Sequence, residues 1–210
     1  LSADEIKALA TPPTAGDPLP ADGAKLSNTW ASFEWSAGLD AVSHDIYIAD
    51  NLNDVATGAA EAFLGNQDAA SLIVGFPGFP FPDGLVLGTT YYWRIDEKQA
   101  DGTTVAGSVW SFRVPDHKSE SPIPADGETF VAVDVTLSWK NGFGVQLPHM
   151  YFGDNLADVE AGAPDTYKGL MVDTAYSPVS IAADTVYYWR IDEFDGITTH
   201  TGDIWSFRTR

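Results

Sequence analysis

The sequence contains no cysteine, so it has neither a disulfide framework nor a thiolate metal site. Basic residues are also few, since 11 Lys and Arg stand against 30 Asp and Glu for a net charge of −19. A field of this sign repels phosphate backbones, so we expect no nucleic-acid partner. No apolar run approaches the roughly 18 residues of a membrane-spanning helix, so we expect no membrane insertion.

Sequence signatures of catalysis are missing as well. There is no G-x-S-x-G and no Gly-rich loop leading into a helix. The four histidines, His44, His117, His149 and His200, are scattered and show no H-E-x-x-H or two-His-one-carboxylate spacing. Carboxylates are so abundant that some pair must lie at glycosidase distance by chance. We therefore expect no enzyme activity and no transition-metal site.

The residues that are present indicate an all-β protein. Hydrophobic residues make up 44% of the chain, enough for an ordinary core. The 19 glycines and 13 prolines are spread along the sequence, as in many short strands joined by turns. One segment, residues 1–10, has a helical period instead, with Ser2 and Glu5 at the spacing of a capping box.

An internal repeat determines the expected domain organisation. Five blocks recur in the same order, the first three at an offset of 104 residues and the last two at 96 and 95. The decrease in offset means that the first copy has about eight extra residues, between positions 56 and 88. The matching pairs are 18–23 with 122–127, 33–35 with 137–139, 47–52 with 151–156, 91–97 with 187–193, and 110–113 with 205–208. We expect a tail at 1–16, a module at 17–115, a linker at 116–121 and a second module at 122–210.

The repeated blocks have the period of β-strands. Apolar and polar residues alternate in each block, which places the apolar side chains on one face. These side chains are the expected core: Trp35, Tyr91, Trp93, Trp110 and Phe112 in the first copy, and Trp139, Tyr187, Trp189, Trp205 and Phe207 in the second.

The blocks resemble fibronectin type III modules. Leu85 lies six residues before Tyr91, as Ile181 lies before Tyr187, which is similar to the tyrosine corner of that family. The resemblance implies two tandem immunoglobulin-like, fibronectin type III-like β-sandwiches. The whole module is also similar to modules of large secreted, planctomycete-like multidomain proteins, so it implies a secreted or cell-surface setting with neighbouring domains as partners. Residues 1–10 weakly resemble the end of a laminin-G or concanavalin-like lectin domain.

The strand Tyr-Tyr-Trp-Arg-Ile-Asp-Glu offers a candidate ligand surface. Its outward side chains, Tyr92, Arg94 and Asp96, suggest an aromatic and charged platform for a sugar, and Tyr188 holds the equivalent place in the second copy. The alternative, which we favour, is cross-strand ion pairing on an exposed sheet face, shielded by a tyrosine ring.

Two acidic turns suggest calcium as the only cofactor. Asp50 and Asp54 flank one turn, and Asp154 and Asp158 flank its counterpart. Calcium takes six to eight oxygen ligands, more than either turn offers. We therefore favour a structural turn in which Asp50 or Asn51 caps one helical turn.

The first copy alone contains the segment Gly75–Pro82, with Phe76, Phe79 and Phe81 between prolines. Such a stiff apolar loop at the end of a sandwich is a candidate contact site. The alternative is that these rings fold back over a module.

Three functions follow from these features. The first is a non-catalytic structural spacer. The second is a carbohydrate-binding accessory module of a polysaccharide-degrading protein. The third is a self-assembling surface-layer, adhesin or fibre subunit, in which the chain docks on copies of itself through the N-terminal segment or the Phe-Pro loop.

Overall fold

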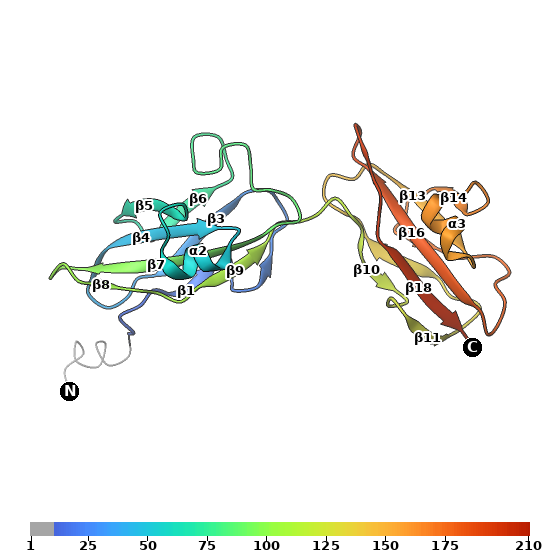
Figure 1. Ribbon diagram of the computed structural model, residues 1–210, viewed down its shortest axis with the longest axis horizontal. Helices are drawn as coiled ribbons and strands as arrows, with labels where there is room; N and C mark the ends of the chain where they lie inside the picture. Colours follow the sequence, from blue (N-terminus) through green and yellow to red (C-terminus); the bar gives the residue numbers. More distant parts are fainter. Residues whose placement is uncertain (1–10) are drawn as a thin grey trace. The chain divides into compact units, whose positions relative to one another are not determined.

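The computed structural model describes residues 11–210, and the helix and lectin-like end expected in residues 1–10 lie outside this range. The chain divides into two compact units, with the boundary between Pro115 and Asp116 (Figure 1). Within the described range no helix is long and apolar enough to span a membrane.

Within the described residues, the first unit contains nine short strands and one short helix. In chain order they are β1 (Gly16–Leu19), β2 (Ala24–Lys25), β3 (Ala31–Ser36), β4 (Ala41–Ala49), α2 (Leu52–Thr57), β5 (Phe63–Gln67), β6 (Ser71–Val74), β7 (Thr90–Gln99), β8 (Thr104–Val105) and β9 (Trp110–Arg113).

The second unit repeats the same series of elements. They are β10 (Glu120–Ile123), β11 (Glu128–Val131), β12 (Leu137–Lys140), β13 (Leu147–Gly153), α3 (Leu156–Ala161), β14 (Tyr167–Leu170), β15 (Ala175–Tyr176), β16 (Val186–Phe194), β17 (Thr199–His200) and β18 (Ile204–Thr209).

Each unit is a two-sheet β-sandwich. In the first, a small sheet of order β1-β3-β6 accompanies a larger one of order β2-β9-β7-β4-β5, with β8 paired to β7. In the second, the corresponding orders are β10-β12-β15 and β11-β18-β16-β13-β14, with β17 paired to β16. All pairings are antiparallel except β2 with β9 and β11 with β18. The predicted fold of two tandem immunoglobulin-like, fibronectin type III-like sandwiches is thus confirmed.

Each sandwich has a hydrophobic core of its own, and the ten aromatic residues expected in the cores are all buried. Trp93 and Trp189 are completely enclosed. Each lies at the centre of the larger sheet, where it packs against the tryptophan of the next strand with ring centroids 4.7 Å apart. Period-2 alternation predicts these positions because one face of each strand lines the sandwich interior.

The structured units begin earlier than the sequence indicated. Ala15, expected in the tail, is buried in the first core. In the second unit, the Asp116 carbonyl accepts a hydrogen bond from the Phe143 backbone N–H, and Ser119 is buried. Residues 116–121, expected as a linker, are therefore part of the second sandwich.

The strand register shows more closely where the extra residues of the first copy lie. Leu72 pairs with Phe33 as Tyr176 pairs with Leu137, so the offset of 104 persists as far as β6. The offset has become 96 by Leu85, which corresponds to Ile181. The insertion therefore lies in the loop between β6 and β7, which contains the Phe-Pro segment.

Candidate functional site

A buried arginine links β7 to the short helix α2. The Arg94 Nη1 donates to the Ala56 carbonyl in the last turn of α2 at 2.6 Å, and its Nη2 and Nε both lie 2.8 Å from the Asp96 carboxylate. The guanidinium carbon stands 4.8 Å from the centre of the Tyr47 ring. A cation near a helix C-terminus and over an aromatic face is stabilised by both.

The second unit reproduces this arrangement contact by contact. Arg190 Nη1 donates to the Glu160 carbonyl in α3 at 2.8 Å, its Nη2 lies 2.9 Å from Asp192, and its guanidinium lies 4.7 Å from the Tyr151 ring centre. Burial raises the pKa of the Tyr151 hydroxyl, as it does for Tyr47 in the first unit.

The expected exposure of this strand face is therefore wrong. Arg94 and Asp96 are only 7% and 5% exposed. The helix α2 packs across β4 and β7 (Figure 1) and holds Arg94 through the Ala56 carbonyl, while the Gly107 N–H donates to Asp96. Tyr92 and Tyr188 are partly buried. The sequence predicts which side chains of the strand point away from the sandwich core. It does not predict that a helix that follows another strand would pack over Arg94.

The other repeated motifs also contact one another. Asp22, from the Pro-rich block, accepts hydrogen bonds from the backbone N–H and the hydroxyl of Ser111, at 2.8 and 3.0 Å. Asp126 and Ser206 form the same pair of bonds in the second unit.

The tyrosine corner is present in both copies. The Tyr91 hydroxyl accepts the Val86 N–H at 3.2 Å, and the Tyr187 hydroxyl accepts the Ala182 N–H at 2.8 Å.

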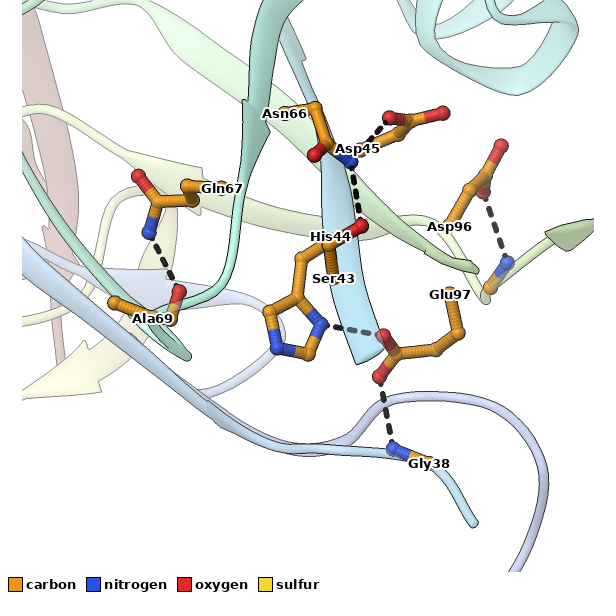
Figure 2. A network of polar contacts seen from close by, with 10 residues as sticks. Gly38, Ser43, His44, Asp45, Asn66, Gln67, Ala69, Asp96 and Glu97 are labelled. Atoms are coloured by element: carbon orange, nitrogen blue, oxygen red, sulfur yellow. Dashed lines mark hydrogen bonds and ion pairs between the residues drawn. The ribbon is translucent and has the colours of Figure 1, made fainter. Parts of the chain in front are cut away.

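A fully buried glutamate ends the motif in each copy, and one of its two partners differs between the copies. In the first unit, the Glu97 carboxylate accepts hydrogen bonds from His44 Nδ1 and the Gly38 N–H, as Figure 2 shows. In the second unit, Glu193 accepts from the Ser119 hydroxyl and the Gly142 N–H. Burial raises the pKa of Glu193 above its usual range.

The Phe-Pro loop presents its rings to two different environments. Phe81 is partly buried and packs edge-on against the core residue Tyr91, with centroids 5.7 Å apart. Phe76 and Phe79 are 49% and 43% exposed. Trp30, which belongs to no repeated sequence motif, is 44% exposed, and its ring centroid lies 6.2 Å from that of Phe76.

The acidic turns form the caps of the two helices. Asn51 and Asn155 are the N-caps of α2 and α3, with side-chain oxygens that accept backbone N–H groups at 2.9 Å. Among residues 11–210, neither Asp50 and Asp54 nor Asp154 and Asp158 belong to a group of three or more clustered metal-ligand side chains. The calcium prediction gains no support from this arrangement.

The structure brings together two histidines that no sequence motif connects. His117, Asp195 and His200, all in the second unit, place ligand atoms within 4.8 Å of one another. No local spacing could indicate this group, because His117 precedes the first strand of the unit and the other two lie around the β16–β17 turn.

No model of a known protein family matches the chain, and no curated protein matches it. Among solved structures, fibronectin(III)-like modules of Clostridium thermocellum CbhA are 10% identical, with a TM-score of 0.34 and 91% of each chain covered. The FN1–FN3 domains of chicken CNTN1 are 12% identical, with a TM-score of 0.30, covering 95% of this chain and 69% of that one. At such values neither likeness indicates a function, and the fold assignment rests on the strand order.

Proposed function

We propose that the chain is a non-catalytic structural pair, which separates neighbouring domains of a secreted or cell-surface protein. The observation that carries this proposal is the mutual contact of the repeated residues. Arg94 bonds Asp96 and α2, Asp22 bonds Ser111, and Tyr91 bonds the backbone before β7. The residues that the two copies share are thus engaged in holding each sandwich together.

A spacer is tested most directly under tension. The full chain is held between two handles and stretched in a single-molecule experiment. Two separate unfolding steps are expected, each adding about 300 Å of contour length, because roughly 90–100 residues extend by about 3.3–3.6 Å each. Extension without a force peak, or in one step for the whole chain, would contradict the proposal.

A second function, carbohydrate binding, is favoured by the exposed aromatic cluster of the first unit. Trp30, Phe76 and Phe79 form this cluster, and we name it the aromatic patch. The loop is anchored beside Trp30, because the Leu85 N–H donates to the Thr29 carbonyl at 2.8 Å and Gly75 packs against that carbonyl with no room for a Cβ. Exposed, anchored rings suit the flat apolar faces of sugar rings in a polysaccharide.

Binding to insoluble and soluble polysaccharides tests this second function. The double variant Trp30→Ala, Phe76→Ala should lose at least tenfold in affinity, while Phe63→Ala should bind as the unmodified chain does. Phe63 is a fair control because it is similarly exposed, at 43%, and packs against Tyr47, with ring centroids 5.2 Å apart, elsewhere in the same unit. Failure of the unmodified chain to bind any polysaccharide would exclude the function.

In the third function, self-assembly, the aromatic patch docks on another copy of the chain. Sedimentation should then show concentration-dependent oligomers that the Trp30→Ala, Phe76→Ala variant no longer forms. A monomer at all concentrations would exclude self-assembly, and a monomer that also binds no polysaccharide would leave the spacer as the remaining function. The alternative docking element, residues 1–10, lies outside the described residues.

A further inference from the structure

The group formed by His117, Asp195 and His200 is the strongest cluster of ligand-type side chains in the described part of the chain. The imidazole rings of His117 and His200 are parallel, with centroids 3.9 Å apart and an interplanar angle of 5°. His200 Nε2 lies 2.8 Å from Asp195 Oδ2. All three residues are partly buried, so the group is fixed by packing yet reachable from solvent.

The backbone orients His117 as a ligand. Its Nδ1 lies 3.0 Å from the Phe143 carbonyl oxygen. A carbonyl only accepts, so Nδ1 carries the proton and Nε2 of the neutral ring has a free lone pair. No hydrogen bond is found for Nε2 within residues 11–210. A histidine whose second ring nitrogen donates to a backbone carbonyl is the usual arrangement in metal sites.

Asp195 is held just as firmly. Its Oδ1 accepts hydrogen bonds from the backbone N–H groups of Ile197 and Thr198, both at 2.8 Å, which leaves Oδ2 directed at His200. These three hydrogen bonds fix the position of the carboxylate beside the two imidazole rings.

This cluster is not part of the shared framework of the two copies. Pro13 takes the place of His117 in the first unit, since its carbonyl packs against Gly38 as the His117 carbonyl packs against Gly142. Val105 takes the place of His200, because it pairs with Glu97 as His200 pairs with Glu193. The first copy thus lacks both imidazoles, and the fold does not require them.

We propose that His117, Asp195 and His200 form a site for a divalent transition-metal ion, with Zn²⁺ as the closest chemical match. Two imidazole nitrogens and one carboxylate oxygen are ligands that Zn²⁺ prefers, at about 2.0–2.2 Å, with water in the remaining position. His200 Nε2 and Asp195 Oδ2 are 2.8 Å apart as hydrogen-bonded partners, and they would move to about 3.3 Å apart as neighbouring ligands of a tetrahedral ion. Binding requires the parallel rings to tilt toward a common point. It also requires the proton on His200 Nε2 to leave that nitrogen, so that the metal-bound ring is neutral with its proton on Nδ1.

Two other charged groups lie near the site. Glu193 lies opposite His200 in the strand register but is not one of the clustered ligands; Ser119 and Gly142 bond its Oε1, and its Oε2 has no hydrogen-bond partner among the described residues. Lys118 is paired with Asp203 at 2.6 Å. An ion bound at the site would tie the first segment of the second unit to the β16–β17 hairpin, and would stabilise that unit because the unfolded chain lacks the site.

Calorimetric titration of the full chain with Zn²⁺ tests the proposal. The expected result is one ion per chain, with affinity reduced at least tenfold in His117→Ala and in Asp195→Asn. The matched control is His149→Ala, because His149 is a partly exposed histidine of the same unit that lies outside the cluster and packs against Tyr167. This control should bind as the unmodified chain does, and a Zn²⁺-dependent rise in melting temperature should affect the second unit alone.

Two outcomes would overturn the proposal. One is no binding at all by the unmodified chain. The other is binding that His117→Ala and Asp195→Asn leave unchanged, or that His149→Ala weakens equally, as expected for loose association with the acidic surface. Circular dichroism of each variant identifies any loss of fold, and Asp195→Asn, which keeps the shape of the side chain, decides the matter if His117→Ala does not fold.

Discussion

Arg190 carries a positive charge that burial removes from water, and its protein contacts replace the lost hydration. It pairs with Asp192 through two nitrogens, bonds the last turn of α3 and lies over the Tyr151 ring. A paired buried charge is tolerated, but removal of one partner leaves the other charge without compensation. Removal of either partner should therefore lower the free energy of unfolding of the second unit, even if the intact pair contributes little to it.

Arg190→Ala should destabilise the second unit by about 3–5 kcal/mol, because Asp192 is left buried and unpaired. Arg208→Ala is the matched control, since Arg208 forms an ion pair with Asp184 in the same unit but with a side chain 52% exposed. Its loss should cost less than about 1 kcal/mol. Urea unfolding of the full chain, followed through NMR signals of the second unit, measures both. Equal effects of the two substitutions would contradict the assigned role.

Glu193 makes the stability of the second unit depend on pH. Burial raises its pKa in the folded state. Between the unfolded value of about 4.3 and the higher folded value, the folded protein holds more protons than the unfolded one, so stability falls as the pH rises through this window. The hydrogen bond from His200 and two backbone hydrogen bonds lower the pKa of Asp195, which acts in the opposite direction, but only below about pH 4.

Glu193→Gln should therefore flatten the decline in stability above about pH 4.3. The amide keeps an oxygen for the Ser119 hydroxyl and the Gly142 N–H, while the titrating proton is removed. Glu160→Gln, on an exposed position of α3, should leave the slope unchanged. Unfolding free energies of the second unit, measured from pH 4.5 to pH 8, give the slopes. An unaltered slope in Glu193→Gln would show that this carboxyl is not the source.

At the scale of the elements, the segment before the last strand of each sandwich passes very close to the central strand of the larger sheet. Gly107 packs against the Ile95 carbonyl of β7, and Gly202 against the Ile191 carbonyl of β16, with no space for a Cβ at either position. Their N–H groups donate to Asp96 and Asp192, each at 3.0 Å. Each crossing thus supports the acidic partner of the buried arginine.

Gly107→Ala should destabilise the first unit by about 3 kcal/mol, since the added methyl overlaps backbone that cannot move without displacing Asp96. Gly16→Ala is the control: Gly16 lies in β1, has no positive φ, and a Cβ there would meet nothing within 4 Å. Its effect should stay within about 0.5 kcal/mol. Thermal unfolding of the first unit compares the two variants, and a Gly107→Ala protein as stable as Gly16→Ala would contradict the close approach.

The sequence predicts the strands of this structure better than it predicts the contacts between elements. Alternation in β7 and β16 predicts Trp93 and Trp189 as core, because a strand has only two faces. The cover over Arg94 depends on α2, a one-turn helix brought across the sheet by tertiary contacts that no local pattern specifies. The same holds for His117 and His200, which are 83 positions apart and meet only through the fold of the second sandwich.

For the molecule as a whole, the two copies share a set of internal contacts and differ in what surrounds them. The shared set comprises the buried arginine, the tyrosine corner and the bond from the Pro-rich block to the Trp-Ser-Phe strand. The first copy adds the aromatic patch, and the second adds the His117, Asp195 and His200 cluster. We expect binding functions to depend on these additions.

The structure implies that the two sandwiches fold separately and that a buried arginine stabilises each of them. Calorimetric unfolding of the full chain, compared with that of the Arg94→Ala variant, tests both statements directly. The unmodified protein should show two transitions, because each unit has its own core. Arg94→Ala should lower one of them by more than about 10 °C, as expected for a loss of several kcal/mol in a domain of roughly 100 residues, and leave the other within about 2 °C. A single transition that shifts as a whole, or two transitions that both stay in place, would contradict this structure of two separately stabilised modules.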